Sequence, residues 1–174
     1  MLKTKVQKAL NDQMNFEIYS AYIYAAMSAY AAEKNFPGFA NWLRIQAGEE
    51  LLIHAAKFEK FIIDRGGHVD FDKIDKPKAG WDSLLAVFEN AYRHECKVSA
   101  NINALYDVAV AEDDKAAQQF LAWFINEQVE EEKNTDQIVQ QLKIIAENPQ
   151  GLFMLDQQLS ARTFVPDPTM SAAG

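Results

Sequence analysis

Apolar residues recur at spacings of three and four along four long stretches of the chain, which is the period of an amphipathic α-helix. Most Pro and Gly residues stand between these stretches, where they end helices. We expect long helices at about 4–34, 38–65, 83–111 and 113–146, and a short fifth helix at 152–159. No stretch alternates with period two for long enough to predict a sheet, so the pattern predicts an all-α protein.

The segment between the second and third expected helices is polar and marked by proline. It covers residues 67–80, which is long enough to cross a helix bundle from end to end. The chain is therefore expected to form a four-helix bundle with a long crossover between helices 2 and 3. We expect a single domain over residues 1–165 and a flexible C-terminal tail over residues 166–174.

The apolar residues of each long helix form a stripe along one face of that helix. Each stripe is interrupted by one glutamate, at a position where the pattern predicts an apolar residue. These residues are Glu17, Glu50, Glu95 and Glu131. Burying an unpaired carboxylate costs several kcal/mol, so four in one core must share cations, pair with bases or take up protons. Few basic residues share the four stripes, whereas His54 follows Glu50 by four residues and reaches the same helix face. This pattern favours a shared metal site.

Bundles that bind two iron ions use a Glu from each of two helices and a Glu-x-x-His from each of the other two. This chain lacks one of those histidines, because Asn134 stands three residues after Glu131. The second ion must then use fewer protein ligands or water. The alternative is a structural bundle whose acidic groove is solvated, and a rise in melting temperature with Fe²⁺ or Zn²⁺ would separate the two.

Composition limits the partners and the compartment. The net charge of −8 argues against a nucleic-acid partner and favours cations. No apolar run approaches the ~18 residues that cross a membrane, and the first residues lack the apolar core of a signal peptide. The single cysteine, Cys96, has no partner for an internal disulfide. We expect a cytoplasmic protein.

Several longer motifs resemble those of the non-haem ferritins of bacteria and archaea, over nearly the whole chain. They are Asn-Phe-Glu-Ile-Tyr-Ser-Ala-Tyr at 15–22, Asn-Trp-Leu-Arg at 41–44, Glu49-Glu50, Tyr-Arg-His-Glu at 92–95, Glu-Gln-Val-Glu-Glu-Glu at 127–132 and Gly-Leu-Phe at 151–153. The resemblance implies a ferritin-like four-helix bundle that stores iron. In that family Fe²⁺ is oxidised by O₂ at a ferroxidase centre inside each subunit and mineralised in a hollow twenty-four-subunit shell.

The resemblance also implies a role for each glutamate of the core. One iron ion would lie among Glu17, Glu50 and His54. The second would lie among Glu50, Glu95 and Glu131, so that Glu50 bridges the two.

Further residues come from the same resemblance. A third iron site maps onto Glu49, Glu127, Glu130 and Glu131. Gln128 would lie close to the second ion, and Tyr24 is the tyrosine expected beside the centre. Trp123 is a further candidate neighbour.

Relatives with other cofactors fit less well. Bacterioferritins carry a haem-binding methionine where this chain has Leu52, so no haem is expected. The starvation-induced mini-ferritins lack a fifth helix. A rubrerythrin-like di-iron redox enzyme remains the alternative function, but it needs an electron source such as a module with paired CxxC motifs, which one cysteine does not supply.

The chain departs from the family at the first histidine. The family has two residues between the bridging glutamate and its histidine, whereas residues 51–53 separate Glu50 from His54. The apolar stripe slips at the same place, because it resumes one position late at His54, Phe58 and Phe61. In a regular helix, each residue turns ~100°, so the extra residue would turn all later side chains away.

A π-bulge absorbs one extra residue in a single wide turn. We therefore predict such a turn near residues 47–55, with His54 directed towards the metal and Phe58 and Phe61 inside. Lys57 would then stay out of the core. The expected assembly is a twenty-four-subunit homo-oligomeric shell or a variant of it, since a rotated helix face would also alter the subunit surface.

Overall fold

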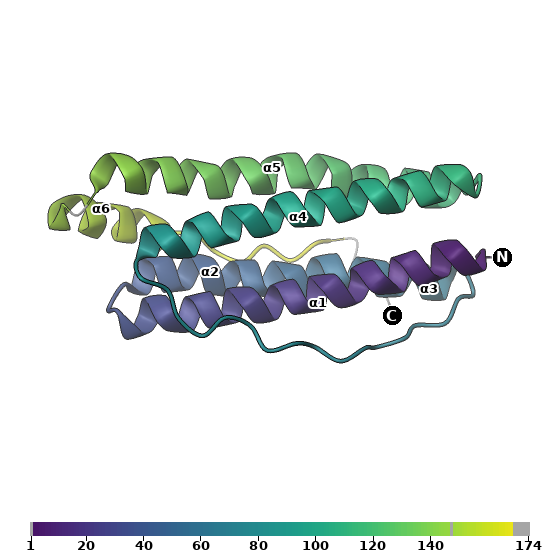
Figure 1. Cartoon of the computed structure of the whole chain (residues 1–174), viewed down its shortest axis with the longest axis horizontal. Helices are drawn as coiled ribbons and strands as arrows, with labels where there is room; N and C mark the ends of the chain where they lie inside the picture. Colours follow the sequence, from purple (N-terminus) through teal and green to yellow (C-terminus); the bar gives the residue numbers. More distant parts are fainter. Residues whose placement is uncertain (1, 147, 169–174) are drawn as a thin grey trace.

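The computed structural model describes residues 2–146 and 148–168, all helical or irregular, without strands in those ranges. The elements are α1 (Thr4–Glu33), α2 (Pro37–Glu49), the π-helix η1 (Glu50–Ala55), α3 (Ala56–Asp64), α4 (Leu84–Ala111), α5 (Lys115–Ile145) and α6 (Pro149–Leu159). α2, η1 and α3 follow one another without a break and act as one long helix. Figure 1 shows this helix beside α1 and shows α5 beside α4, which confirms the expected bundle.

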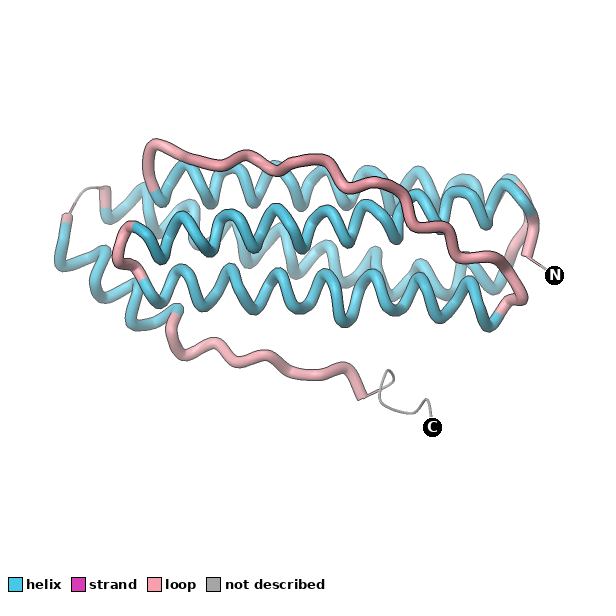
Figure 2. Tube along the Cα trace, turned by 90° about the horizontal axis from the view of Figure 1, so that it is seen from below, coloured by secondary structure: helices cyan, strands magenta, loops and turns pink. Residues whose placement is uncertain are grey.

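The crossover runs along the outside of the bundle from one end to the other, as expected (Figure 2). Side chains of α1 hold it in place. The Asn11 amide donates to the carbonyl oxygen of His68 at 3.0 Å and accepts from the backbone N–H of Asp70 at 2.7 Å. Asn15 repeats this pattern, donating to the carbonyl oxygen of Asp70 and accepting from the N–H of Asp72. The two asparagines satisfy backbone groups that no sheet or helix would pair.

Side-chain caps explain where the later helices begin. The hydroxyl of Ser83 accepts from the N–H of Ala86 at 3.1 Å and caps α4. The carboxylate of Asp114 caps α5 and also accepts from the Arg65 guanidinium at 3.0 Å. The short last helix begins at Pro149, three residues before the expected start, because proline suits a first helical position and the preceding residue, Asn148, supplies the cap.

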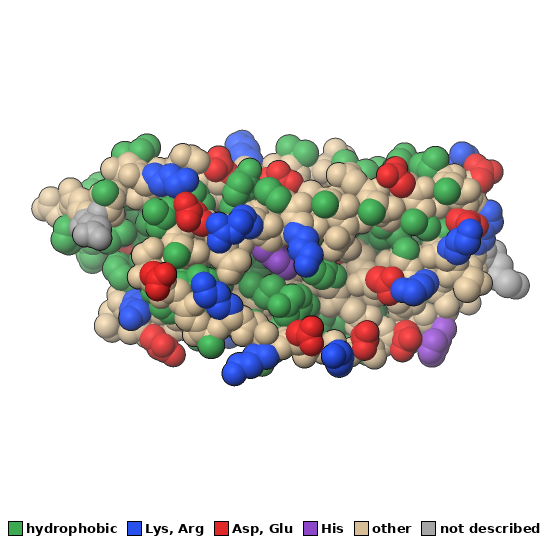
Figure 3. Space-filling view, in the orientation of Figure 1, with side chains coloured by type: hydrophobic (Ala, Val, Ile, Leu, Met, Phe, Trp, Pro, Cys, Tyr) green, Lys and Arg blue, Asp and Glu red, His purple; other side chains and the backbone are tan. Residues whose placement is uncertain are grey.

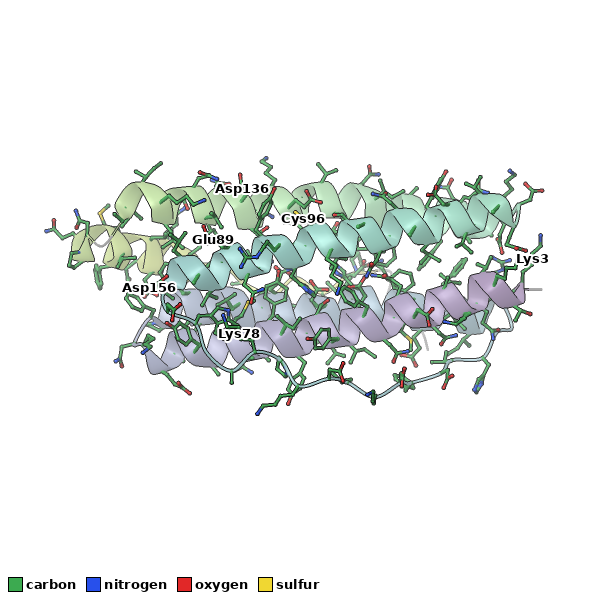
Figure 4. All side chains as sticks on the ribbon, in the orientation of Figure 1. Lys3, Lys78, Glu89, Cys96, Asp136 and Asp156 are labelled. Carbon is green, nitrogen blue, oxygen red and sulfur yellow. The ribbon has the colours of Figure 1, made fainter. Side chains whose placement is uncertain are left out.

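The last described helix, α6, is docked on the start of α2. The buried carboxylate of Asp156, labelled in Figure 4, accepts from the backbone N–H groups of Gly38 at 2.8 Å and Phe39 at 3.0 Å. These N–H groups belong to the first turn of α2 and have no partner within the helix. A negative charge there is also favoured by the helix dipole.

The apolar core consists of two clusters at different levels along the bundle. One includes Phe39, Trp42 and Phe88 and is closed by α6. The other includes Phe58 and Phe124 and lies towards the opposite end. The four glutamates of the stripes belong to neither cluster and occupy the level between them.

The outer surface carries charges of both signs. Figure 3 shows acidic and basic side chains interspersed over the face formed by α1, α4 and the crossover. None of the described helices is long and apolar enough to cross a membrane.

The chain after α6 turns back along the bundle. Figure 2 places these residues on the side opposite the crossover. Residues 160–168 are described and contact α2 and α3. Residues 169–174 lie outside the described part, so the flexibility expected of the tail 166–174 stays a prediction.

Candidate metal centre

Four helical segments direct one carboxylate each into the space between the two apolar clusters. Glu17 comes from α1, Glu50 from η1, Glu95 from α4 and Glu131 from α5, and all four side chains are buried. The sequence stripes therefore located all four correctly inside the bundle. Oε2 of Glu17 and Oε2 of Glu131 have no hydrogen-bond partner, although both atoms are inaccessible to solvent.

Burial and mutual repulsion raise the pKa of every one of these carboxyls. Desolvation, followed by the charge of Glu50, raises the pKa of Glu17 and of Glu95 to about 8. Desolvation, followed by the charge of Glu95, raises the pKa of Glu131 to about 7. The pKa of Glu50 is raised well above its usual range by desolvation and by Glu131. A cation at their centre would stabilise the ionised carboxylates and so offset both burial and mutual repulsion, and the donor set therefore fits a divalent metal ion.

The predicted wide turn is present and is confirmed as the π-helix η1, Glu50–Ala55. It brings Nδ1 of His54 to 3.0 Å from Oε2 of Glu50, and both side chains are buried. Phe58 is fully buried, while Phe61 is half-buried at the edge of the core. Lys57 is half-buried at the edge of the bundle rather than in either apolar cluster, and its ammonium pairs with Asp167 at 2.6 Å. The single wide turn thus returns the rest of the helix to its register.

Two groups of three side chains bring metal-ligating atoms within 4.8 Å of one another among the described residues. The first group is Glu17, Glu50 and His54, which is the expected first iron site. The second is His54, Glu127 and Glu131. His54 thus lies between the two groups, whereas the family resemblance assigns it to the first alone.

The expected second site, Glu50 with Glu95 and Glu131, is not among these close groups. Glu95 is instead hydrogen-bonded to two neutral side chains. Its Oε1 accepts from the hydroxyl of Tyr24, and its Oε2 accepts from the amide of Gln128 at 3.2 Å. Both carboxylate oxygens are therefore held by neutral donors. Burial and the charge of Glu95 raise the pKa of Tyr24, which keeps this hydroxyl protonated as a donor.

Two glutamines contact the centre that the sequence reasoning did not single out. The amide of Gln13 donates to Oε1 of Glu17 at 2.8 Å, and the amide of Gln46 donates to Oε1 of Glu50 at 3.3 Å. Both are buried. Each precedes its glutamate by four residues on the same helix, and this spacing was the signal available in the sequence.

A buried histidine lies beside Tyr24 on the side of α1 and α4. Nε2 of His94 is 2.7 Å from the hydroxyl oxygen of Ser20, and its ring stacks on Phe16. Burial, followed by the charge of Lys97, lowers the pKa of His94 to about 4, so the ring is neutral at neutral pH.

The residues expected to form a third site are only partly gathered. Glu131 is buried, Glu49 and Glu127 are half-buried, and Glu130 is exposed. The carboxylate of Glu49 forms an ion pair with the guanidinium of Arg162. The expected neighbour Trp123 stands edge-on to His54, with ring centroids 5.8 Å apart.

Comparison with known proteins identifies the family of the chain. Residues 7–145 match the family of ferritin-like domains. The chain is 43% identical over 162 residues to a bacterial non-heme ferritin of Bacteroides fragilis, covering 93% of this chain and 100% of that one. It is 37% identical over 164 residues to a bacterial non-heme ferritin of Staphylococcus aureus, covering 94% and 98%.

Solved structures of ferritins from the archaeon Archaeoglobus fulgidus share the fold. An engineered closed form superposes with a TM-score of 0.93 at 43% identity, covering 95% of this chain and 100% of that one. The open-pore ferritin of the same organism gives a TM-score of 0.92 at 43% identity, covering 94% and 100%. With its bundle, its crossover and its buried carboxylates, the chain belongs to the ferritin family, among the non-haem ferritins of bacterial and archaeal type.

Proposed function

We propose that this protein stores and detoxifies iron by oxidising Fe²⁺ with O₂ at the buried centre. The observation that carries the proposal is the set of four buried carboxyls and His54 between the two apolar clusters. Iron is the substrate. The ferritins reported above share this fold, and nothing among them favours the alternative of a rubrerythrin-like redox enzyme.

The chemistry follows from placing two ferrous ions close together. Two ions about 3.5–4 Å apart deliver two electrons to one O₂ molecule, so that two Fe²⁺, O₂ and two protons yield two Fe³⁺ and H₂O₂. In the metal-free protein, the raised pKa values keep much of the centre protonated at neutral pH. Binding of Fe²⁺ releases these protons, which makes them available for the reduction of O₂.

The residues of the centre take different parts in this proposal. Glu17 and His54 hold the first ion, Glu131 and Glu95 hold the second, and Glu50 lies between the two ions. Because the second close group also contains His54, this ring is positioned to contact either ion. Tyr24 and Gln128 orient Glu95 and hold its oxygens until the second ion arrives.

The third site, formed by Glu49, Glu127, Glu130 and Glu131, would receive iron on its way from the centre to the mineral. Three of its four carboxylates, those of Glu49, Glu127 and Glu130, are more exposed than the carboxylates of the centre. Ions there are held less tightly and are released more readily. No haem is proposed, because Leu52 has no sulfur to offer and points to the outer surface with 57% of its area exposed.

The proposed assembly is a homo-oligomeric shell, with twenty-four subunits as the family resemblance implies or a variant of that number. Large apolar side chains at the end formed by α5 and α6 are exposed in the single chain, including Ile144, Phe153 and Met154. Exposed apolar side chains grouped in this way are typical of surfaces that neighbouring subunits cover. Particle size measured by light scattering tests this, and a monomer would contradict it. The location in the cytoplasm stays a prediction.

Anaerobic titration with Fe²⁺, followed by admission of air, tests the oxidation itself. The wild-type protein is expected to bind two ions per subunit at the centre and to oxidise them far faster than buffer does. Glu50→Ala removes the carboxylate between the ions and should abolish most of the fast phase. Glu59→Ala, which removes an equal charge from α3 outside the centre, is the matched control and should leave the rate unchanged. Fast oxidation in Glu50→Ala would contradict the proposal.

A further inference from the structure

The segment that follows α6 forms a strap along α2 and α3, defined here as residues 160–168. The amide of Asn41 donates to the carbonyl oxygens of Ser160 at 3.3 Å and Arg162 at 3.0 Å. The ring of Phe164 lies over Gly48, where a Cβ atom would be 3.6 Å from it. Arg162 and Phe164 are half-buried, while their neighbours Thr163 and Val165 are exposed. The strap therefore runs as an extended chain with one face on the bundle.

Arg162 is the first anchor of the strap. Its guanidinium donates to the carboxylate of Glu49 and, at 2.9 Å, to Oε1 of Gln46. It also lies over the ring of Trp42, 4.5 Å from the centroid. Gln46 in turn donates to Glu50, so a single side chain separates Arg162 from the buried centre. The side chains of Arg162 and Glu49 retain only 23% and 18% of their exposure, which strengthens their attraction compared with a fully solvated pair.

Asp167 is the second anchor. Its carboxylate pairs with the ammonium of Lys57 at 2.6 Å, and both side chains are largely buried. The same ammonium lies 4.5 Å from the centroid of Trp123, whose ring contacts His54. The charges of Lys57 and Asp167 both act on Glu127, with opposite sign. The two anchors thus stand beside Glu49 and Glu127, which are two of the carboxylates of the proposed third site.

We propose that Arg162 is a tethered counter-cation of the third iron site, which pairs with Glu49 until iron displaces it. The inference rests on the function proposed above. A guanidinium and a divalent ion repel each other, so in this proposal iron competes with Arg162 for the Glu49 carboxylate and frees the first anchor of the strap when it binds. The third site therefore binds iron with lower affinity than the centre does. Binding of iron at the third site is also coupled to release of residues 160–168. By linkage, the strap in turn weakens iron binding at this site.

Zinc binding measured by calorimetry tests the competition, because Zn²⁺ binds carboxylates and histidine without being oxidised. The wild-type protein should bind zinc tightly at the centre and more weakly at a third site. Arg162→Gln should tighten the third affinity about tenfold and leave the tighter ones unchanged. Arg162→Lys keeps the charge and should restore the wild-type affinity. Lys60→Gln is the control, since it removes an equal charge from an exposed pair with Asp64.

Each result decides the inference. A third affinity that is unchanged or weaker in Arg162→Gln, an equal gain in Lys60→Gln, or absence of any third site in the wild type would overturn it. If any of these results is found while the wild-type protein still oxidises Fe²⁺ rapidly, the proposed function stands and only the role of Arg162 is wrong. Protein that neither binds zinc at the centre nor oxidises Fe²⁺ loses the proposed function as well.

Crystals of the wild-type protein soaked with Zn²⁺ give an independent readout. Anomalous scattering should place an ion at Glu49, with the guanidinium of Arg162 moved out of contact with that carboxylate. An ion at Glu49 beside an intact ion pair would overturn the inference.

Discussion

Nδ1 of His54 lies 3.0 Å from Oε2 of Glu50 because the helix between them widens by one residue. In a uniform α-helix, the extra residue would turn His54 ~100° away from the place where a residue at position 53 would sit. The π-helix η1 takes up the extra residue within one wide turn and leaves Phe58 in the core. This local solution keeps beside Glu50 a ring nitrogen that could bind a metal ion.

Deleting Leu52 should convert η1 into a regular helical turn without disturbing the centre. Leu52 is exposed, and the rest of the helix already lies in the register that a shorter helix would have. Zinc affinity at the centre should stay within about threefold, and the melting temperature should be equal or higher because a strained turn is removed. Calorimetry and circular dichroism measure both.

The control is deletion of Glu59 from the regular helix α3. No wide turn is available there, so the residues that follow turn by ~100° and the buried Ile62 leaves the core. This variant should melt at a clearly lower temperature. Loss of zinc binding in the Leu52 deletion would show that the centre needs the π-helix itself.

The stability of the metal-free protein should fall as pH rises from about 5 to about 8. The carboxyls of Glu17 and Glu95 have a pKa of about 8 and that of Glu131 about 7 in the folded protein, against 4.5 ordinarily. Between these values, the folded chain holds more protons than the unfolded chain, so unfolding releases protons and is favoured by higher pH. Zinc competes with these protons and therefore binds more tightly as pH rises.

The measurement is the melting temperature at pH 5, 6, 7 and 8, with and without excess Zn²⁺. The difference between the two curves should widen steadily over this range. A difference independent of pH would show that the centre is already ionised when it is empty.

Tyr24→Phe should weaken binding of the second metal ion at the centre. The hydroxyl of Tyr24 donates to Oε1 of Glu95 and fixes the orientation of that carboxylate. Loss of a partner that orients a ligand typically weakens metal binding by about tenfold or more. Tyr30→Phe, which alters a buried tyrosine in the cluster around Phe39, is the control and should leave zinc affinity unchanged. Equal zinc affinities in the two variants would show that Tyr24 plays no part in metal binding at the centre.

Two glycines should respond in opposite ways to replacement by alanine. A Cβ atom at Gly48 would be 3.6 Å from the ring of Phe164, which is an ordinary contact. Gly48→Ala should therefore stabilise the helix by about 0.5–1 kcal/mol and raise the melting temperature by about 1–4 °C. A Cβ atom at Gly38 would lie 1.7 Å from the carbonyl oxygen of Asp156, so Gly38→Ala must push α6 away and lower the melting temperature. A destabilising Gly48→Ala would mean that Phe164 packs more tightly than the structure shows.

The sequence alone determined the helices, the crossover and the level at which the carboxyls lie. These features are periodic or local, so the identity of nearby residues suffices to predict them. The slip in the apolar stripe after Glu50 likewise predicted the wide turn, because only one register buries His54 and Phe58 together.

Only the tertiary structure decided which side chains share the centre. His54 joins Glu127 and Glu131 because η1 faces α5 at this level, whereas Glu95 accepts hydrogen bonds from Tyr24 and Gln128. Arg162 reaches Glu49 across 113 positions of sequence because Asp156 docks α6 on the start of α2. Such pairings depend on rotamers and on contacts between distant elements, which no periodicity along the chain encodes.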